Sequence, residues 1–124
     1  MPNAFDRGSC RLLDDLGFPA LATTSGGYAA SMGRTDMTTD RGELVDHVVS
    51  LHSASNLPIN VDAEQCYPGS DGGVPATVHL LAAAGASGCS IEDWDPVRGV
   101  IETSILPPSE WQRLVPPPTT SAPC

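Results

Sequence analysis

The 124-residue chain contains no lysine, and its six basic residues are all arginines. Fifteen aspartates and glutamates oppose them, so the formal net charge at pH 7 is −9. Binding to nucleic acids or to anionic membranes depends on clustered basic side chains. The arginines are instead scattered from Arg7 to Arg113. The composition therefore excludes nucleic acid and membrane surfaces as partners.

The chain also lacks a long apolar run. No stretch approaches the roughly 18 residues of a membrane-spanning helix, and the first thirty residues show no basic start followed by an apolar segment. The four cysteines, Cys10, Cys66, Cys89 and Cys124, form neither a CxxC pair nor a Cys/His metal spacing. We therefore expect a cytoplasmic protein whose thiols are reduced.

The composition changes near Pro96. Six of the twelve prolines lie between Pro107 and Cys124, in a segment without apolar periodicity. Such a composition is typical of polyproline-like or disordered chain. The sequence therefore predicts a folded region over residues 1–96 and a disordered, Pro-rich tail over residues 97–124.

Short apolar segments alternate with helical patterns in the folded region. The expected strands lie before Asp6 and at residues 20–23, 59–64 and 87–93, and the expected helices at 8–16, 40–56 and 74–84. This alternation predicts parallel βα units and an α/β fold. About four units are half of a (β/α)₈ barrel. A small open, doubly wound sheet is the alternative, which periodicity does not distinguish from half a barrel.

Polar residues follow the expected strands. In either fold, ligands bind at the carboxyl ends of the strands. Side chains alternate along a strand, which places Asp62 and Glu64 on one side, and Ser90 and Glu92 together on the next strand. If these faces converge, Asp62, Glu64 and Glu92 form an all-oxygen cluster suited to Mg²⁺ or Mn²⁺. Solvated or helix-capping carboxylates are the alternative that the spacing leaves open.

Four runs of residues carry a resemblance to a known family. They are residues 3–12, 17–27, 57–64 and 84–93. In this order and spacing they resemble the isocitrate lyase / phosphoenolpyruvate mutase superfamily, and in particular its mutase-like branch. The resemblance covers residues 3–96 and implies a partial TIM-type barrel, the N-terminal half of the family fold.

The resemblance also implies a site. The substrate carboxylate site of the family corresponds to Ser25, Gly26 and Gly27, in what the sequence suggests is a glycine-rich turn with free N–H groups. The main metal-ligand aspartate of the family corresponds to Asp62. The family carboxylates that help to hold the metal, often through water, correspond to Glu64 and Glu92. A further acidic residue near the metal corresponds to Asp36.

The chemistry implied by the resemblance is a Mg²⁺-dependent lyase or mutase reaction. Such enzymes form or cleave a C–C or C–P bond next to an α-keto acid, through a pyruvate enolate, and their substrates are small α-keto acids or phosphonates. The catalytic residue stays unknown, because the family loop with its acid/base cysteine is replaced by residues 94–98.

Two departures from the family pattern lead to an alternative. Residues 66–69 read Cys-Tyr-Pro-Gly where the family has Gly-Tyr-Gly, and the second half of the barrel is missing. We therefore expect a fragment or frameshift product with weak or no activity, prone to form homo-oligomers or to aggregate. The alternative function is a catalytically silent partial barrel that acts, if at all, through interactions.

Overall fold

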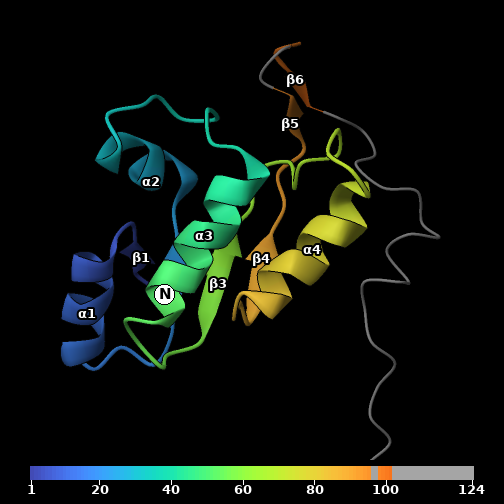
Figure 1. Ribbon diagram of the computed structural model, residues 1–124. Coiled ribbons are helices and arrows are strands. Elements are labelled where there is room, and N and C mark those ends of the chain that lie inside the picture. Colours follow the sequence, from blue (N-terminus) through green and yellow to red (C-terminus); the bar gives the residue numbers. More distant parts are fainter. Residues whose placement is uncertain (96–97, 102–124) are drawn as a thin grey trace, which may run out of the picture.

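The computed structural model describes residues 1–95 and 98–101. A four-stranded parallel sheet lies at its centre (Figure 1). The strands, in their order across the sheet, are β1 (Asn3–Ala4), β2 (Leu21–Thr23), β3 (Ile59–Asp62) and β4 (Gly88–Ser90). The helices are α1 (Arg7–Asp15), α2 (Ser25–Ser31), α3 (Arg41–His52) and α4 (Gly73–Ala83).

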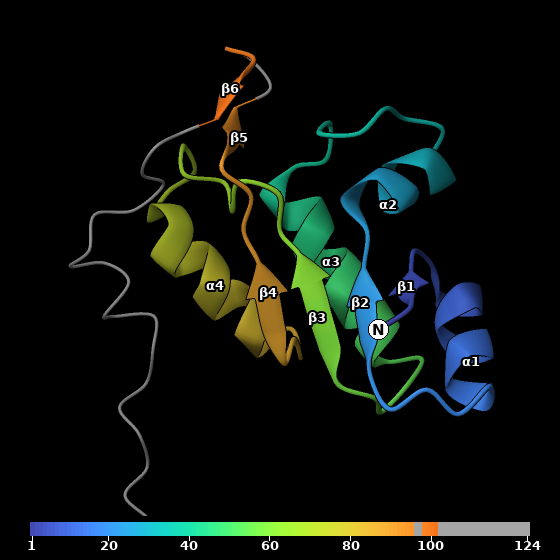
Figure 2. The ribbon, with the colours of Figure 1, turned by 180° about the vertical axis from the view of Figure 1, so that it is seen from behind.

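The order of the strands in the sheet follows the order of the chain. Helices α3 and α4 cover one face, and the view from behind shows the strands of the other face in front of them (Figure 2). A doubly wound sheet reverses its strand order at a switch point, and the described strands show no reversal. The predicted α/β fold with a parallel sheet is confirmed, while the partial barrel stays a prediction.

None of the described helices is long and apolar enough to cross a membrane.

Local signals in the sequence set the ends of the helices. Asp6 caps α1 and Asp40 caps α3, each in a capping box with the residue three positions later. These reciprocal bonds satisfy N–H groups that have no acceptor within the helix. Gly17 follows α1 with a φ of 80°, a conformation that glycine adopts without steric cost. The helix that the Asp40 capping box predicted is α3, and this prediction is confirmed.

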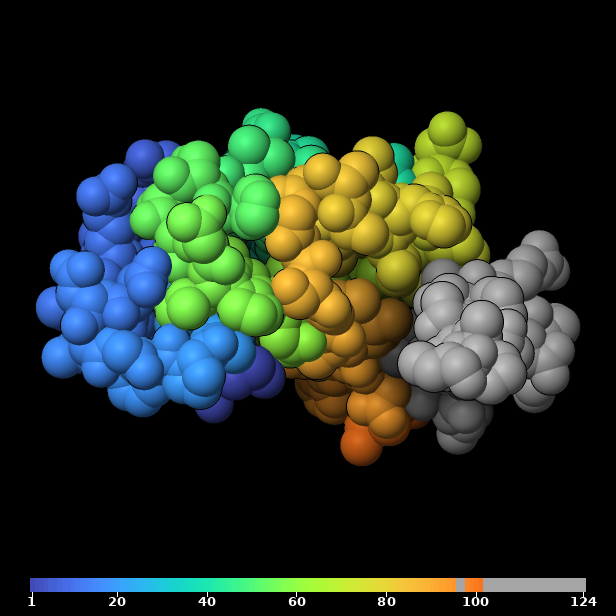
Figure 3. All heavy atoms as spheres, turned by 90° about the horizontal axis from the view of Figure 1, so that it is seen from below, coloured from blue at the N-terminus to red at the C-terminus, as the bar shows by residue number. Residues whose placement is uncertain are grey.

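The core lies between the sheet and the helices. Leu21, Ile59 and Val61 are fully buried, as are Leu51 of α3 and, within 1%, Leu81 of α4. Burial of such side chains contributes roughly 25 cal/mol per Å² of apolar surface. Seen from the end at which the strands begin, α3 and α4 pack side by side, with α1 at one end of the described molecule (Figure 3).

Helix α2 is a helix that the sequence did not predict. Residues 25–27 read as a turn, because glycines lower helix propensity, but Ser25–Ser31 is a short helix. Thr24 caps it by accepting a hydrogen bond from the Gly27 N–H at 3.3 Å. The glycine-rich segment is therefore the first turn of a helix at the carboxyl end of β2.

The expected tail differs from the structure at its beginning. Residues 98–101 belong to a hairpin in which β5 (Trp94–Asp95) pairs with β6 (Val100–Ile101). The Gly99 N–H donates to the Asp95 carbonyl at 2.8 Å. The expected disorder from residue 97 onward stays a prediction, while local turn bonds place residues 98–101 in this hairpin. The Pro-rich segment after Pro107 lies outside the described residues.

Candidate active site

Asp62 ends β3 and joins two segments that are far apart in the sequence. Its Oδ2 accepts hydrogen bonds from the Ser25 N–H at 2.9 Å and the Ser25 hydroxyl at 2.8 Å. Its own N–H donates to Thr23 Oγ1 at 2.9 Å. Because β2 and β3 are adjacent and parallel, their carboxyl ends meet at one edge. The proposed metal-ligand aspartate therefore contacts the proposed substrate turn directly.

The N–H groups of that turn are less free than the sequence suggested. The Ser25 N–H is bonded to Asp62, and the Gly27 N–H is bonded to the Thr24 hydroxyl. The expectation of free donors is therefore wrong for these two residues, because Asp62 accepts one N–H and the helix cap Thr24 accepts the other. Gly26 lies between them and is half-buried.

Asp36 lies against Gly26. A Cβ atom built on Gly26 would be 3.2 Å from both Cγ and Oδ2 of Asp36. The Met37 N–H donates to Asp36 Oδ1 at 2.9 Å, and Met37 has a φ of 59°. The connection between α2 and α3 thus brings Asp36 to the same turn that Ser25 ties to Asp62.

Substitution of Gly26 by alanine tests this contact against a matched control. Gly8 is the second residue of α1 as Gly26 is of α2, and a Cβ on Gly8 would have only an ordinary 3.5 Å contact with Asp6. Gly8→Ala should raise the free energy of unfolding by about 0.5 kcal/mol, because alanine is the better helix former. Gly26→Ala should bring no gain, because Asp36 must move. Urea denaturation measures both, and equal gains would contradict the contact.

Glu64 is a buried carboxylate just beyond the end of β3. Its side chain is 6% exposed. Its φ of 51° is left-handed, so the alternation of side chains along a strand does not determine the direction of this side chain. Its N–H donates to Asp62 Oδ1 at 3.3 Å, and its Oε1 accepts from the Thr39 hydroxyl at 3.3 Å. Burial raises the pKa of Glu64, with smaller contributions from Asp36 and other carboxylates against the lowering effect of Thr39.

Glu92 completes the acidic surroundings. Its N–H donates to the Glu64 carbonyl at 2.7 Å, while its side chain is exposed. Desolvation, followed by the negative charges of Asp62 and Asp36, raises the pKa of Glu92. Within residues 1–95 and 98–101, ion pairs join Arg34 to Glu43 and Arg98 to Asp95. No basic side chain of that part of the chain forms an ion pair with the four site carboxylates.

The four carboxylates fit a divalent cation only in part. In the described part of the chain, no three His, Cys, Asp or Glu side chains are placed to hold an ion by themselves. The direct convergence expected of Asp62, Glu64 and Glu92 is not reached, because β3 and β4 end at Asp62 and Ser90 and the glutamates lie on the loops beyond. Mg²⁺ usually keeps several waters and binds one or two carboxylates. Glu64 is buried, lies close to Asp62 and has no ion-pair partner among the described residues, which fits that mode of binding.

Sequence reasoning missed two features of the site. Thr39, which bonds to Glu64, is marked only by its position before the Asp40 capping box. Cys66 has a φ of 61° and is fully buried. A left-handed backbone at this position explains why a family pattern would place glycine there, since glycine adopts it without steric cost.

Comparisons with known proteins show which family this chain is similar to. The family model of phosphoenolpyruvate phosphomutase matches residues 1–112. An oxaloacetate decarboxylase of Rhodopseudomonas palustris (strain TIE-1) is 40% identical over 95 residues, which cover 73% of this chain and 32% of that protein. The structure of an inferred lyase/mutase from Burkholderia cenocepacia J2315 shows 46% identity and a TM-score of 0.74, over 77% of this chain and 35% of that one. Oxaloacetate acetylhydrolase in complex with its product oxalate shows 26% identity and a TM-score of 0.70, over 76% and 34%.

These relatives define a class of enzymes, the lyases and mutases that share this α/β fold. The chain belongs to the phosphoenolpyruvate mutase / isocitrate lyase superfamily, as the resemblance predicted. It spans about a third of the length of the curated relatives that it matches. The family match extends beyond Pro96 to residue 112, so the expected boundary at Pro96 stays a prediction.

Proposed function

We propose that this chain carries part of the active site of a Mg²⁺-dependent lyase or mutase acting on a small α-keto acid. One observation supports this most: Asp62 binds both donors of Ser25 while Asp36 lies on Gly26. These contacts support the proposal that the turn resembling the substrate carboxylate site and the acidic residues resembling the metal site belong to one site.

Each residue has a proposed task at this site. Asp62 would hold Mg²⁺ or Mn²⁺ directly, and Glu64, Glu92 and Asp36 would hold its water ligands. The bound ion would supply a Lewis acid for the keto and carboxylate oxygens of the substrate. The first turn of α2 would orient the substrate carboxylate, with the Gly26 N–H as its donor, since first-turn N–H groups have no acceptor within a helix.

The proposed reaction is bond cleavage next to the keto group. In oxaloacetate, the C3–C4 bond would break, CO₂ would leave, and the electron pair would remain on the pyruvate enolate, which takes up a proton at C3. The decarboxylase relative favours this reaction over cleavage of a C–P bond. A phosphonate substrate is the second possibility within the same class.

Calorimetric titration with oxalate tests the proposal, because oxalate resembles the planar enolate and does not react. We expect oxalate to bind only when Mg²⁺ is present, and Ser25→Ala to weaken binding by about tenfold through the loss of a bond to Asp62. A Ser87→Ala variant, which changes an exposed serine at the opposite end of the sheet, should bind as the wild type does. Absence of oxalate binding at millimolar Mg²⁺ would contradict the proposal.

A silent partial barrel is the second candidate function. It is favoured by the sheet face that no described helix covers (Figure 2). Among the described residues, the outer edges of β1 and β4 have no strand partner. Such edges are sites where other strands can pair, so we propose a homo-oligomer in this case. An assembly detected by light scattering, together with no binding of Mg²⁺ or oxalate, would favour this candidate.

A further inference from the structure

We infer that Thr39 is a positioning residue that fixes the Glu64 carboxylate through a chain of hydroxyl groups beginning at Tyr67. Thr39 Oγ1 lies 3.3 Å from Glu64 Oε1 and 3.3 Å from the Tyr67 hydroxyl. Thr39 is 8% exposed and Glu64 is 6% exposed, so water competes little for either bond. The inference rests on the proposed function, because it assigns Glu64 to the ion site.

The chemistry of the groups sets the direction of the chain. A threonine hydroxyl has one proton to donate and two lone pairs that accept. An ionised carboxylate only accepts, so the Thr39 proton goes to Glu64. The oxygen of Thr39 is then left to accept the proton of the Tyr67 hydroxyl. Both bonds form only with Thr39 in one rotamer, and this geometry fixes the direction of the carboxylate.

Glu64 needs such a partner because no other described residue holds its carboxylate. Among the described residues, Thr39 alone donates a hydrogen bond to this carboxylate. The backbone of Glu64, Cys66 and Tyr67 is left-handed, with φ values between 51° and 61°, so regular strand geometry does not aim these side chains. Repulsion by Asp36 and Asp62 would otherwise turn the carboxylate away from the site.

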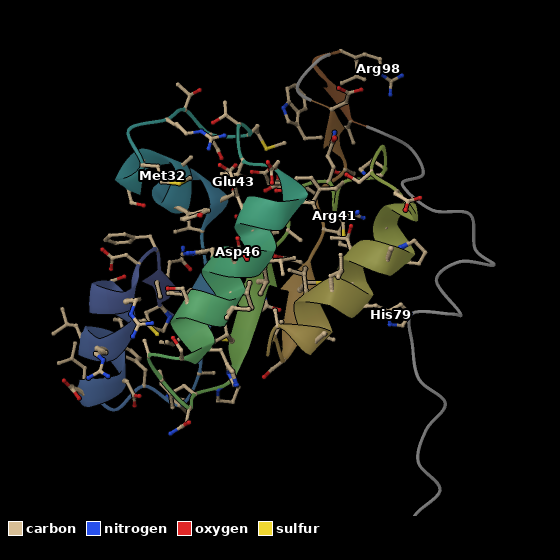
Figure 4. All side chains as sticks on the ribbon, in the orientation of Figure 1. Met32, Arg41, Glu43, Asp46, His79 and Arg98 are labelled. Atoms are coloured by element: carbon tan, nitrogen blue, oxygen red, sulfur yellow. The ribbon has the colours of Figure 1, made fainter. Side chains whose placement is uncertain are left out.

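Thr39 is itself held firmly. It directly precedes Asp40, whose capping box with Glu43 consists of two bonds of 2.8 Å. Arg34 donates to Glu43 Oε1 at 2.6 Å and also to the Thr38 carbonyl. Figure 4 shows Glu43 near the start of α3, facing the connection from α2. A β-branched side chain on this fixed backbone has few rotamers, so Thr39 can act as a stiff support.

The test compares Thr39→Val with Thr39→Ser. Valine keeps the shape and the branched Cβ but loses the hydroxyl, whereas serine keeps the hydroxyl. We expect Thr39→Val to weaken Mn²⁺ binding about tenfold, the lower range for loss of an outer partner of a metal ligand. Thr39→Ser should bind within about twofold of the wild type. Electron paramagnetic resonance of free Mn²⁺ measures the affinities, and thermal denaturation checks that each variant is folded.

A metal-free measurement separates this inference from the proposed function. The ¹³C resonance of the Glu64 carboxyl should shift in Thr39→Val and stay close to the wild-type position in Thr39→Ser. A wild type that does not bind Mn²⁺ but shows this pattern would overturn the proposed function and leave Thr39 as the positioning residue of Glu64. An unchanged Glu64 resonance in Thr39→Val, or equal Mn²⁺ affinities of valine and serine variants, would overturn the inference.

Discussion

Asp62→Asn is expected to weaken Mn²⁺ binding on the order of 100-fold, the upper range measured for partners of metal ligands. The substitution keeps the shape of the side chain and an oxygen that can accept from Ser25, so α2 should stay in place. It removes the negative charge of the proposed direct ligand, and a divalent cation prefers charged oxygen. Titration of Mn²⁺ followed by electron paramagnetic resonance gives the two affinities, and circular dichroism shows whether the variant is folded.

Asp93→Asn is the matched control. It removes the same charge from an exposed carboxylate next to Glu92, and Asp93 is the weakest of the causes that raise the pKa of Glu92. Mn²⁺ affinity in this variant should therefore stay within about twofold of the wild type, as expected for exposed charges screened by solvent. Equal affinities of the wild type and Asp62→Asn would remove the metal site at Asp62.

Stability should depend on pH through His47, on α3. Its side chain is 5% exposed, and its ring stacks on Tyr28 with the ring centres 3.8 Å apart. Nε2 is buried without a hydrogen-bond partner in the described part of the molecule. Burial lowers the pKa of His47 from 6.5 to about 4, against a smaller raising effect of the negative charge on Asp6. The folded state therefore favours the neutral imidazole.

The free energy of unfolding should fall as the pH falls from 6.5 to about 4. In this window the unfolded chain binds a proton at His47 and the folded chain does not, so protonation favours unfolding. Above pH 6.5 the contribution of His47 to the free energy of unfolding is fully present, and below about pH 4 this contribution does not fall further. A difference between 6.5 and about 4 corresponds to a total loss of about 3 kcal/mol. Urea denaturation at several pH values measures it.

His47→Phe serves as the control for this pH dependence. Phenylalanine keeps a ring that can stack on Tyr28 but does not titrate. Glu64 and Glu92 act in the opposite sense, because their raised pKa values give stability that is present below the ordinary value and is lost as the pH rises. Both proteins share that contribution, so the difference between the two curves isolates His47. Parallel curves would show that His47 does not titrate as its burial implies.

The sequence by itself determined the features that depend on neighbouring residues. The capping box of Asp40 and Glu43 predicted α3, because both partners lie within one turn. The alternation of strands and helices predicted the parallel sheet, because short connections leave few other arrangements. Asp62 could be placed at the edge of the sheet, since a strand that ends in a polar residue leaves it there.

Only the tertiary structure decided which of these residues meet. Ser25 and Asp62 are 37 positions apart, and Thr39 and Glu64 are 25 apart. Their contacts exist because adjacent parallel strands bring distant loops to one edge. Alternation failed for Glu64 because its backbone leaves the strand in a left-handed conformation. Helix α2 was missed because its cap and its bonds to Asp62 outweigh the low helix propensity of its glycines. Hydrogen bonds between residues that are distant in the chain cannot be predicted from the local sequence.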